Sequence, residues 1–254
     1  MERDNMVKSV SRALDIITLV SMKKEGLGVT EIANQMDINK SSVYRILTTL
    51  AQYGYIEQYA DSGRYRLGYT FLDISSKLLD SIDIRTEAKP YLQELGKVTH
   101  EVIHLVVYDH DEVVYIEKFE GTETLRMHSK VGRRAPMHCT GVGKAILAYL
   151  PTSTTEEIIE RKGLPAHTKY TITDRENFLS ELEAVKQRGY ALDLQENEVG
   201  ITCIAVPIFD HAGNPVAALS VSGPTIRMTD ERMEELKPHV LETGANISRR
   251  LGYR

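Results

Sequence analysis

Polar side chains gather along one side of the segment KSSVYRILTTL, residues 40–50. These amine, hydroxyl, phenol, guanidinium and amide groups belong to Lys40, Ser41, Ser42, Tyr44, Arg45, Thr48 and, just beyond the segment, Gln52. An arginine can bond both acceptors on the edge of a guanine, and hydroxyls can donate to phosphates or bases. Such a helix face suits the major groove of DNA. The alternative is a solvated polar face that binds nothing.

Two helices joined by a short turn must position this face. The first of them is expected in TEIANQM, capped by Thr30, and the second begins near Lys40. Ala33 is small enough for the place where two such helices cross, and Val43 packs the second helix back onto the first. Asp37 stands in the turn, where a left-handed backbone is common, and aspartate accepts that conformation.

A further helix and a hairpin complete the expected N-terminal domain. The helix in SVSRALDIITLVSM is capped by Ser9 or Ser11. Its apolar stripe is expected to be Val10, Ala13, Leu14, Ile17 and Val20. The hairpin turns at DSG, and Arg64 and Arg66 are expected at its tip, suited to phosphate or minor-groove contact. These elements predict a winged helix-turn-helix domain over residues 1–70.

The remainder of the chain predicts a linker helix at 71–84 and a second domain at 85–254. The second domain mixes helices with β-rich runs: EVIHLVVYD, EVVYIEKFE, LRMHSKV and a hairpin around DHAGN. Pro90 is expected in the first turn of a helix. Another helix is expected to start with a capping box of Thr173 and Glu176 and to stop at Gly189. The fold class is therefore α+β.

Composition restricts the class of protein. The 254 residues are 42% hydrophobic and 26% charged, which is typical of a globular protein. The net charge of −5 divides into +1 over residues 1–70 (nine basic, eight acidic) and −6 over the rest (22 basic, 28 acidic), so only a local patch can face DNA. No apolar run reaches the ~18 residues of a membrane helix, and the charged start has no signal core. A cytoplasmic protein without a membrane partner is expected.

The motif CTGVGK, residues 139–144, suits a small acid. Small residues at a helix start let a ligand approach the backbone, whose unpaired N–H groups favour a carboxylate. The alternative is a tight structural turn capped by Thr140. Ser220 and Ser222 share one face of a later strand, which is either a solvent face or the wall of a pocket.

Cysteine and histidine leave an enzyme or metal site as the alternative function. Cys139 beside His138 suggests a thiol nucleophile, but adjacent side chains usually point apart. His100, His104 and His110 form no convincing ligand spacing with a nearby carboxylate. No cofactor and no metal are expected. Loss of turnover in Cys139→Ala would support the alternative.

Three ordered blocks over some 240 residues resemble the IclR-type bacterial transcriptional regulators. They are the N-terminal helix-turn-helix from SVSRALDIITLV to GRYRLG, then GRRAPMHCTGVGKAILAYLP, then GYALDLQENEVGITCIAVPIFDHAGNPVAALSVSGPTIRMT. The resemblance implies a GAF-like effector-binding domain after the winged helix-turn-helix and the linker helix. It also implies a homodimer or a dimer of dimers on double-stranded operator DNA.

The resemblance also implies an effector site for a small carboxylate. Gly141 and Val142 match positions whose backbone holds the acid group of the effector, and Asp193 matches one that hydrogen-bonds the ligand. The implied set is Arg126, Met127, Gly141, Val142, Asp193, Cys203, Ser220 and Ser222. EVIHLVVYD, VVYIEKFE and LRMHSKVGRRAP are most similar to the branch that senses 2-keto-3-deoxygluconate, which favours a repressor of a sugar-acid operon.

Overall fold

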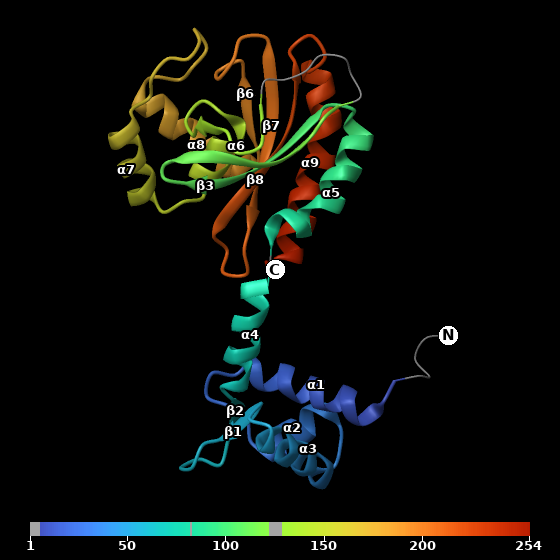
Figure 1. Ribbon diagram of the computed structural model, residues 1–254. Helices are drawn as coiled ribbons and strands as arrows, with labels where there is room; N and C mark the ends of the chain where they lie inside the picture. The colour runs from blue at the N-terminus through green and yellow to red at the C-terminus, as the bar shows by residue number, and fades with distance from the viewer. Residues whose placement is uncertain (1–5, 82, 122–128) are drawn as a thin grey trace. The chain divides into compact units, whose positions relative to one another are not determined.

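A computed structural model describes residues 6–81, 83–121 and 129–254 (Figure 1). The chain divides into two compact units, Met1–Ile82 and Asp83–Arg254. Among the described residues, no helix is long and apolar enough to cross a membrane.

The first unit is the predicted winged helix-turn-helix. Its elements are α1 (Lys8–Ser21), α2 (Val29–Met36), α3 (Lys40–Gln52), β1 (Ile56–Gln58), β2 (Tyr65–Leu67) and α4 (Thr70–Ser81). One apolar cluster joins three helices to the hairpin, and it includes Ile16, Ile32, Val43, Leu47 and Ile56, each no more than 1% exposed. This small core holds α3 with its opposite side outward.

The turn between α2 and α3 has the predicted conformation. Asp37 adopts φ 52° and ψ 47°, and the N–H of Ile38 donates to the carbonyl of Ala33 at 3.1 Å. Ala33 is buried, as its place at the helix crossing requires. The predicted cap at Thr30 is wrong: the cap is Gly28, whose N–H donates to the Glu31 side chain at 2.8 Å. This bond is the half of a capping box that glycine can form, and the helix starts at Val29, one residue earlier than Thr30.

The predicted stripe and cap of α1 are also wrong in part. The helix begins at Lys8 after Val7, with no side-chain cap. Ile16 and Val20 are its buried residues, whereas Val10 and Leu14 are 55% and 58% exposed. The buried positions lie in the second half of α1 because only that half packs on the small core.

The second unit contains one antiparallel sheet with the strand order β5-β4-β3-β8-β7-β6. The strands are β3 (Val102–Asp109), β4 (Glu112–Phe119), β5 (Arg134–Pro136), β6 (Ala191–Leu194), β7 (Ile201–Phe209) and β8 (Pro215–Pro224). The helices are α5 (Ile84–Thr99), α6 (Gly141–Leu147), α7 (Thr152–Lys162), α8 (Arg175–Arg188) and α9 (Asp230–Arg250). The predicted hairpin around DHAGN joins β7 to β8.

Helices cover both faces of this sheet (Figure 1). A Cβ on Gly244 of α9 would meet Val206, whereas a Cβ on Gly141 of α6 would meet Ala205. Adjacent residues of a strand point to opposite faces, so α9 and α6 lie on opposite sides. The α5 and α9 layer, the sheet, and the α6 and α8 layer form the α+β architecture expected of a GAF-like domain.

Local signals for the helix ends of this unit were partly misleading. Gly189 ends α8 at φ 83° as predicted, but the N-cap is Asp174 rather than Thr173, since its carboxylate accepts the N–H of Asn177 at 2.9 Å. Pro90 lies inside α5 and not in its first turn, because Asp83 caps the helix well upstream. The predicted strand LRMHSKV falls mostly outside the described residues, and 129–131 form no strand.

Candidate DNA-binding surface and effector pocket

The outer face of α3 carries most of the predicted DNA-binding side chains. Lys40, Ser41, Tyr44, Arg45 and Thr48 are all exposed. No ion pair holds Lys40 or Arg45 within the described part of the chain, so both charges are available to a phosphate or a base.

Ser42 and Gln52 differ in their surroundings. Ser42 is half-buried, and its hydroxyl lies 2.6 Å from Oδ1 of Asn39, to which it donates. It therefore braces the start of α3 from beneath the outer face. Gln52 is exposed at the last position of the helix.

The two arginines of the hairpin occupy different places, since Arg66 lies in β2 and Arg64 lies at the end of the connecting loop. Arg64 pairs with Glu31 at 2.9 Å and donates to the carbonyl of Gly26 at 3.2 Å. Arg66 pairs with Glu57 at 3.0 Å. Tyr65 between them is buried in the core. The predicted place at the tip is wrong for Arg66, which lies in the ladder opposite Glu57, whereas Arg64 is the last residue of the loop 59–64 that joins the strands.

A cavity of about 560 Å³ lies between α6 and the sheet of the second unit. Six of the eight residues expected to bind an effector line it: Gly141, Val142, Asp193, Cys203, Ser220 and Ser222. They come from α6 and three strands that are separated by up to 81 residues (222 − 141) along the chain. Arg126 and Met127 lie outside the described residues.

Strand register explains why these side chains meet. Asp193, Cys203 and Ser222 lie directly opposite one another on β6, β7 and β8. Residues paired in this way point to the same face of the sheet. In the next row, two residues along, Ala205 of β7 lies opposite Ser220 of β8. A row of polar side chains therefore borders a row that contains the small side chain of Ala205.

The start of α6 lies directly over the small residues. A Cβ at Gly141 would be 3.2 Å from that of Ala205, so the helix backbone approaches the sheet closely. Gly143 has even less room, since a Cβ there would lie 2.2 Å from the carbonyl oxygen of Met137. Thr140 caps the helix by accepting the N–H of Gly143 at 3.1 Å.

Two backbone N–H groups remain for a ligand. No acceptor is present for the N–H of Gly141 or of Val142 in the part of the chain that the structure describes. Both residues line the cavity, at the positive end of a helix. Two such N–H groups suit a carboxylate, and the turn capped by Thr140 that stood as the alternative is the same structure.

Asp193 has a structural role that the sequence did not reveal. Its Oδ1 accepts the N–H of Glu196 at 2.7 Å and that of Asn197 at 3.3 Å, which fixes the loop after β6. Burial, together with the nearby Glu196 carboxylate, raises the pKa of this carboxyl to about 7, against the lowering effect of those hydrogen bonds. The side chain is therefore a carboxyl whose charge changes near neutral pH.

A buried ion pair stands behind the pocket. Lys144 of α6 is 1% exposed and pairs with Glu196, while Glu181 of α8 lies 3.8 Å from its Nζ. Breaking such a pair strands a buried charge and costs about 3–5 kcal/mol. The pair thus fixes α6 against the loop that Asp193 braces.

Sequence reasoning missed further cavity-lining side chains: His104, Tyr115, Ser129, Arg133, Arg134, Thr140, His167, Asn197 and Glu198. His104 could have been found as the one histidine in the apolar run VIHLVV. The other positions come from loops and from strands β4 and β5, for which the sequence provides no register.

The thiol chemistry considered for Cys139 has no support in the geometry. Burial raises the pKa of this thiol to about 12, and its Sγ lies 3.7 Å from Oδ1 of Asn197. The ring of His138 has Nε2 within 2.9 Å of the carbonyl oxygen of Pro165. A protonated, buried thiol is a poor nucleophile.

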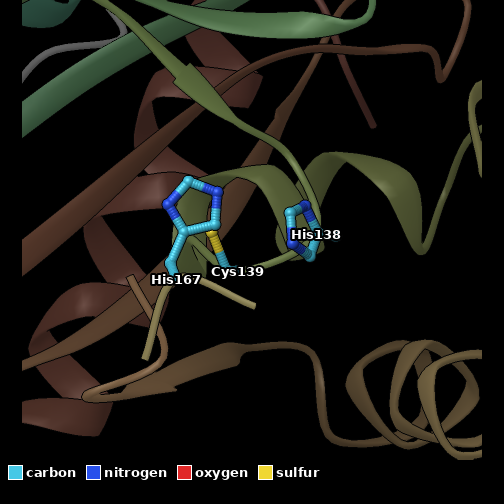
Figure 2. A group of neighbouring side chains, drawn as sticks. All are labelled: His138, Cys139 and His167. Atoms are coloured by element: carbon cyan, nitrogen blue, oxygen red, sulfur yellow. The ribbon is translucent and has the colours of Figure 1, made fainter. Parts of the chain in front are cut away.

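Figure 2 shows His138, Cys139 and His167 facing one another. Among the described residues, this is the one group of three side chains whose metal-ligating atoms lie within 4.8 Å of one another. In a tetrahedral zinc site, metal–ligand bonds of about 2.0–2.3 Å place the ligating atoms closer to one another than 4.8 Å. The three side chains would therefore have to move together to bind zinc. His100, His104 and His110 lie outside this group.

Comparison with known protein families covers both units. The model described as the IclR helix-turn-helix domain matches residues 9–60, and the one described as bacterial transcriptional regulator IclR C-terminal matches residues 76–249. Among curated proteins, the chain is 38% identical over 248 residues to the HTH-type transcriptional regulator XynR of Escherichia coli, covering 98% of each chain. It is 36% identical over 252 residues to KdgR of Dickeya chrysanthemi, covering 99% of this chain and 82% of that one.

Solved structures agree. The IclR protein of Thermotoga maritima is 36% identical with a TM-score of 0.66, and 97% of this chain and 99% of that chain are covered. The C-terminal domain of Escherichia coli KdgR is 36% identical with a TM-score of 0.62, covering 68% of this chain and all of that one. The exposed recognition helix, the matched domains and these relatives show that the chain belongs to the IclR family and is a DNA-binding transcriptional regulator.

Proposed function

We propose that a small carboxylate effector bound in the 560 Å³ cavity controls operator binding by this regulator. The observation that carries the proposal is the convergence of six expected residues on one cavity at the N-terminus of α6. The acid group bonds the N–H groups of Gly141 and Val142. Ser220, Ser222 and Cys203 form the opposite floor, and Asp193 accepts from a hydroxyl or a hydrated carbonyl.

The protein works as a repressor of a sugar-acid operon, with 2-keto-3-deoxygluconate as the first effector to test. The relatives named KdgR support this choice. It acts without catalysing a reaction, and its place is the cytoplasm, where its DNA target lies. Arg45 reads bases while Lys40, Ser41, Tyr44 and Thr48 contact the backbone or neighbouring bases, and Arg64 and Arg66 reach phosphates once they leave their acidic partners.

The regulator binds a palindromic operator as a homodimer or a dimer of dimers, joined in part through helix α4 (Thr70–Ser81). Two recognition helices must enter major grooves about 34 Å apart or a multiple of that distance. Effector binding alters the spacing of the two helices, and a mismatch of a few ångströms weakens operator binding.

A thermal-shift screen of the full chain tests the effector. An acid that binds only the folded state raises the free energy of unfolding by mass action, by about 2.7 kcal/mol at a hundredfold excess over Kd, and the thermal midpoint rises with it. We expect a shift with 2-keto-3-deoxygluconate and a smaller one, or none, in Ser222→Ala. Pyruvate, glyoxylate and aromatic acids serve as comparison ligands. An unchanged midpoint with every acid would refute the effector proposal and leave DNA binding intact.

A further inference from the structure

We infer that His104 determines effector specificity: it organises a wall of the cavity that reads hydroxyl groups on the effector chain, away from its acid group. The inference rests on the proposed function and names the ligand class for the same cavity. That class is the hydroxylated acid whose carbon chain is long enough to reach from α6 to strands β8 and β3.

The first observation is a convergence of hydroxyls on one imidazole. Nε2 of His104 lies 2.7 Å from Oγ of Ser129. Nδ1 lies 3.4 Å from Oγ of Ser220 and 3.3 Å from Oγ of Ser222, and these two oxygens are 3.2 Å apart. His104 lies opposite Ser220 in the register of β3 with β8, so the strands themselves fix the arrangement.

The second observation is that the ring is neutral. His104 is 2% exposed, and Tyr115 packs edge-on against it with 5.0 Å between ring centroids. Burial, together with the nearby Lys118 ammonium, lowers the pKa of His104 to about 3. One ring nitrogen therefore donates and the other accepts at neutral pH.

Counting protons shows what this wall can bind. If Nε2–H donates to Ser129, Nδ1 accepts from one serine and the second serine donates to the first. The protons of Ser220 and Ser222 are then used, and the wall presents oxygen lone pairs together with the one hydroxyl proton of Ser129. If instead Nδ1–H donates to a serine, one hydroxyl proton is left for the ligand. A hydroxyl group, which both donates and accepts, satisfies either arrangement.

Other ligand groups fit the wall less well. A carboxylate accepts only, and the wall offers it at most one proton. An alkyl chain satisfies nothing and would cover buried polar atoms without replacing the hydrogen bonds that water makes to them. The hydroxyl wall is therefore complementary to the α6 end of the cavity, which offers N–H donors to an acid.

The distance between the two ends sets the length of the ligand. Gly141 lies over Ala205 of β7, whereas His104 is on β3, two strands away across β8. Neighbouring strands are about 4.8 Å apart, so the two ends are separated by roughly 10 Å at the backbone. Ser220 and Ser222 of β8 are one strand from Ala205, and an acid of five or six carbons held at α6 extends past them to the β3 side of the wall.

The test compares two six-carbon keto acids by titration calorimetry on the full chain. 2-Keto-3-deoxygluconate and 2-oxohexanoate share the carboxylate, the keto group and the chain length, and differ only in three hydroxyls. We expect the native chain to prefer the hydroxylated acid by about 30-fold or more, since a site built to bond hydroxyls rejects analogues that lack them. His104→Phe should reduce the preference to about threefold or less. The variant should bind 2-keto-3-deoxygluconate more weakly and 2-oxohexanoate more tightly than the native chain does.

Two more variants keep the outcome interpretable. His239→Phe changes an exposed histidine of α9 and should leave the preference unchanged. If His104→Phe does not fold, Ser220→Ala retains the ring and should still lower the preference at least several-fold. The ¹⁵N shifts of the His104 imidazole should change when the hydroxylated acid binds and stay constant with 2-oxohexanoate.

The outcomes separate this inference from the proposed function. The inference about the hydroxyl wall is refuted if the native chain binds both acids equally, or if His104→Phe lowers the affinity for both by the same factor. Either result leaves the proposed effector cavity intact. If the native chain binds neither acid nor any other carboxylate, the proposed function fails, and the inference fails with it.

Discussion

Arg45 and the hairpin arginines carry the same charge but are held differently. Arg64 and Arg66 already bond Glu31 and Glu57, whereas Arg45 extends from an exposed helix face. A guanidinium without an acidic partner reaches a guanine without first breaking an ion pair. Base reading is therefore assigned to Arg45.

Arg45→Ala is expected to weaken binding to the preferred operator by about 1–3 kcal/mol and to relax selectivity at one base pair. Fluorescence anisotropy on operator variants at one fixed salt concentration measures both effects. Arg45→Lys is the matched control, because it retains the charge but loses the bidentate geometry and should lose selectivity. An equal loss on every sequence would mean that Arg45 contacts phosphate only.

Asp193 makes effector binding depend on pH. Its pKa of about 7 means that it loses a negative charge as the pH falls from about 8 to 6, while the effector acid stays ionised. We expect affinity for the acid to rise over that interval, by no more than about tenfold per pH unit because one proton is involved. In Asp193→Asn the affinity should become independent of pH. Persistence of the dependence in that variant would assign it to another group.

The same shift affects stability with a defined sign. The folded-state pKa lies above the ordinary value of 3.8, so between about pH 4 and 7 the folded state holds the proton more often than the unfolded state does. This contribution to the free energy of unfolding is full below about pH 4 and is lost as the pH rises through about 7. Lys144 and Glu196 also act on Asp193, so Asp193→Asn should remove only its own part of the slope.

At the scale of elements, α6 depends on two glycines that do different work. Gly143 permits the contact with Met137, where an added Cβ would lie 2.2 Å from a backbone oxygen. At Gly141 an added Cβ would lie 3.2 Å from the Cβ of Ala205, which is tight but involves a side chain rather than the backbone, and Gly141 lines the cavity. The first glycine is needed for packing and the second for ligand approach.

Gly143→Ala should lower stability by about 3 kcal/mol or more, because a backbone atom cannot yield. Gly141→Ala should change stability by no more than about 1 kcal/mol, since alanine favours the helix by a similar amount. It should still weaken effector binding about tenfold by crowding the acid site. Thermal unfolding and effector titration of both variants test this contrast. Equal destabilisation by both would contradict the division of roles.

At the scale of the molecule, reading and sensing belong to separate units. Every residue that lines the cavity lies in Asp83–Arg254, and the recognition helix lies in Met1–Ile82. The two cores contain no common residues. Each activity can therefore be measured by itself, and coupling between them is a property of the assembled regulator.

A chain of residues 83–254 should bind the effector with the affinity of the full chain, within about threefold, when DNA is absent. The C-terminal domain of Escherichia coli KdgR has been solved as a separate chain, which supports the feasibility of the experiment. Calorimetry of both chains with the same acid provides the comparison. A large loss in the shorter chain would show that the first unit contributes to the site.

The sequence alone determined the elements whose signals are local. Helical spacing placed Arg45 and Tyr44 on one face of α3, and alternation placed Ser220 and Ser222 on one face of β8. Asp37 marked the turn because few other residues adopt a left-handed backbone. Such features depend on neighbours within a few positions, so they can be predicted from one chain.

Only the tertiary structure decided which distant groups meet. His104 and Ser220 are 116 residues apart and become partners because β3 lies beside β8. Helix caps at Gly28 and Asp174 were missed because several candidate residues stood within one turn, and backbone geometry selected among them. Arg66 was placed at the tip because the sequence does not show where the pairing of β1 with β2 ends. Register, burial and ion pairing depend on the whole fold, and no short stretch of sequence specifies them.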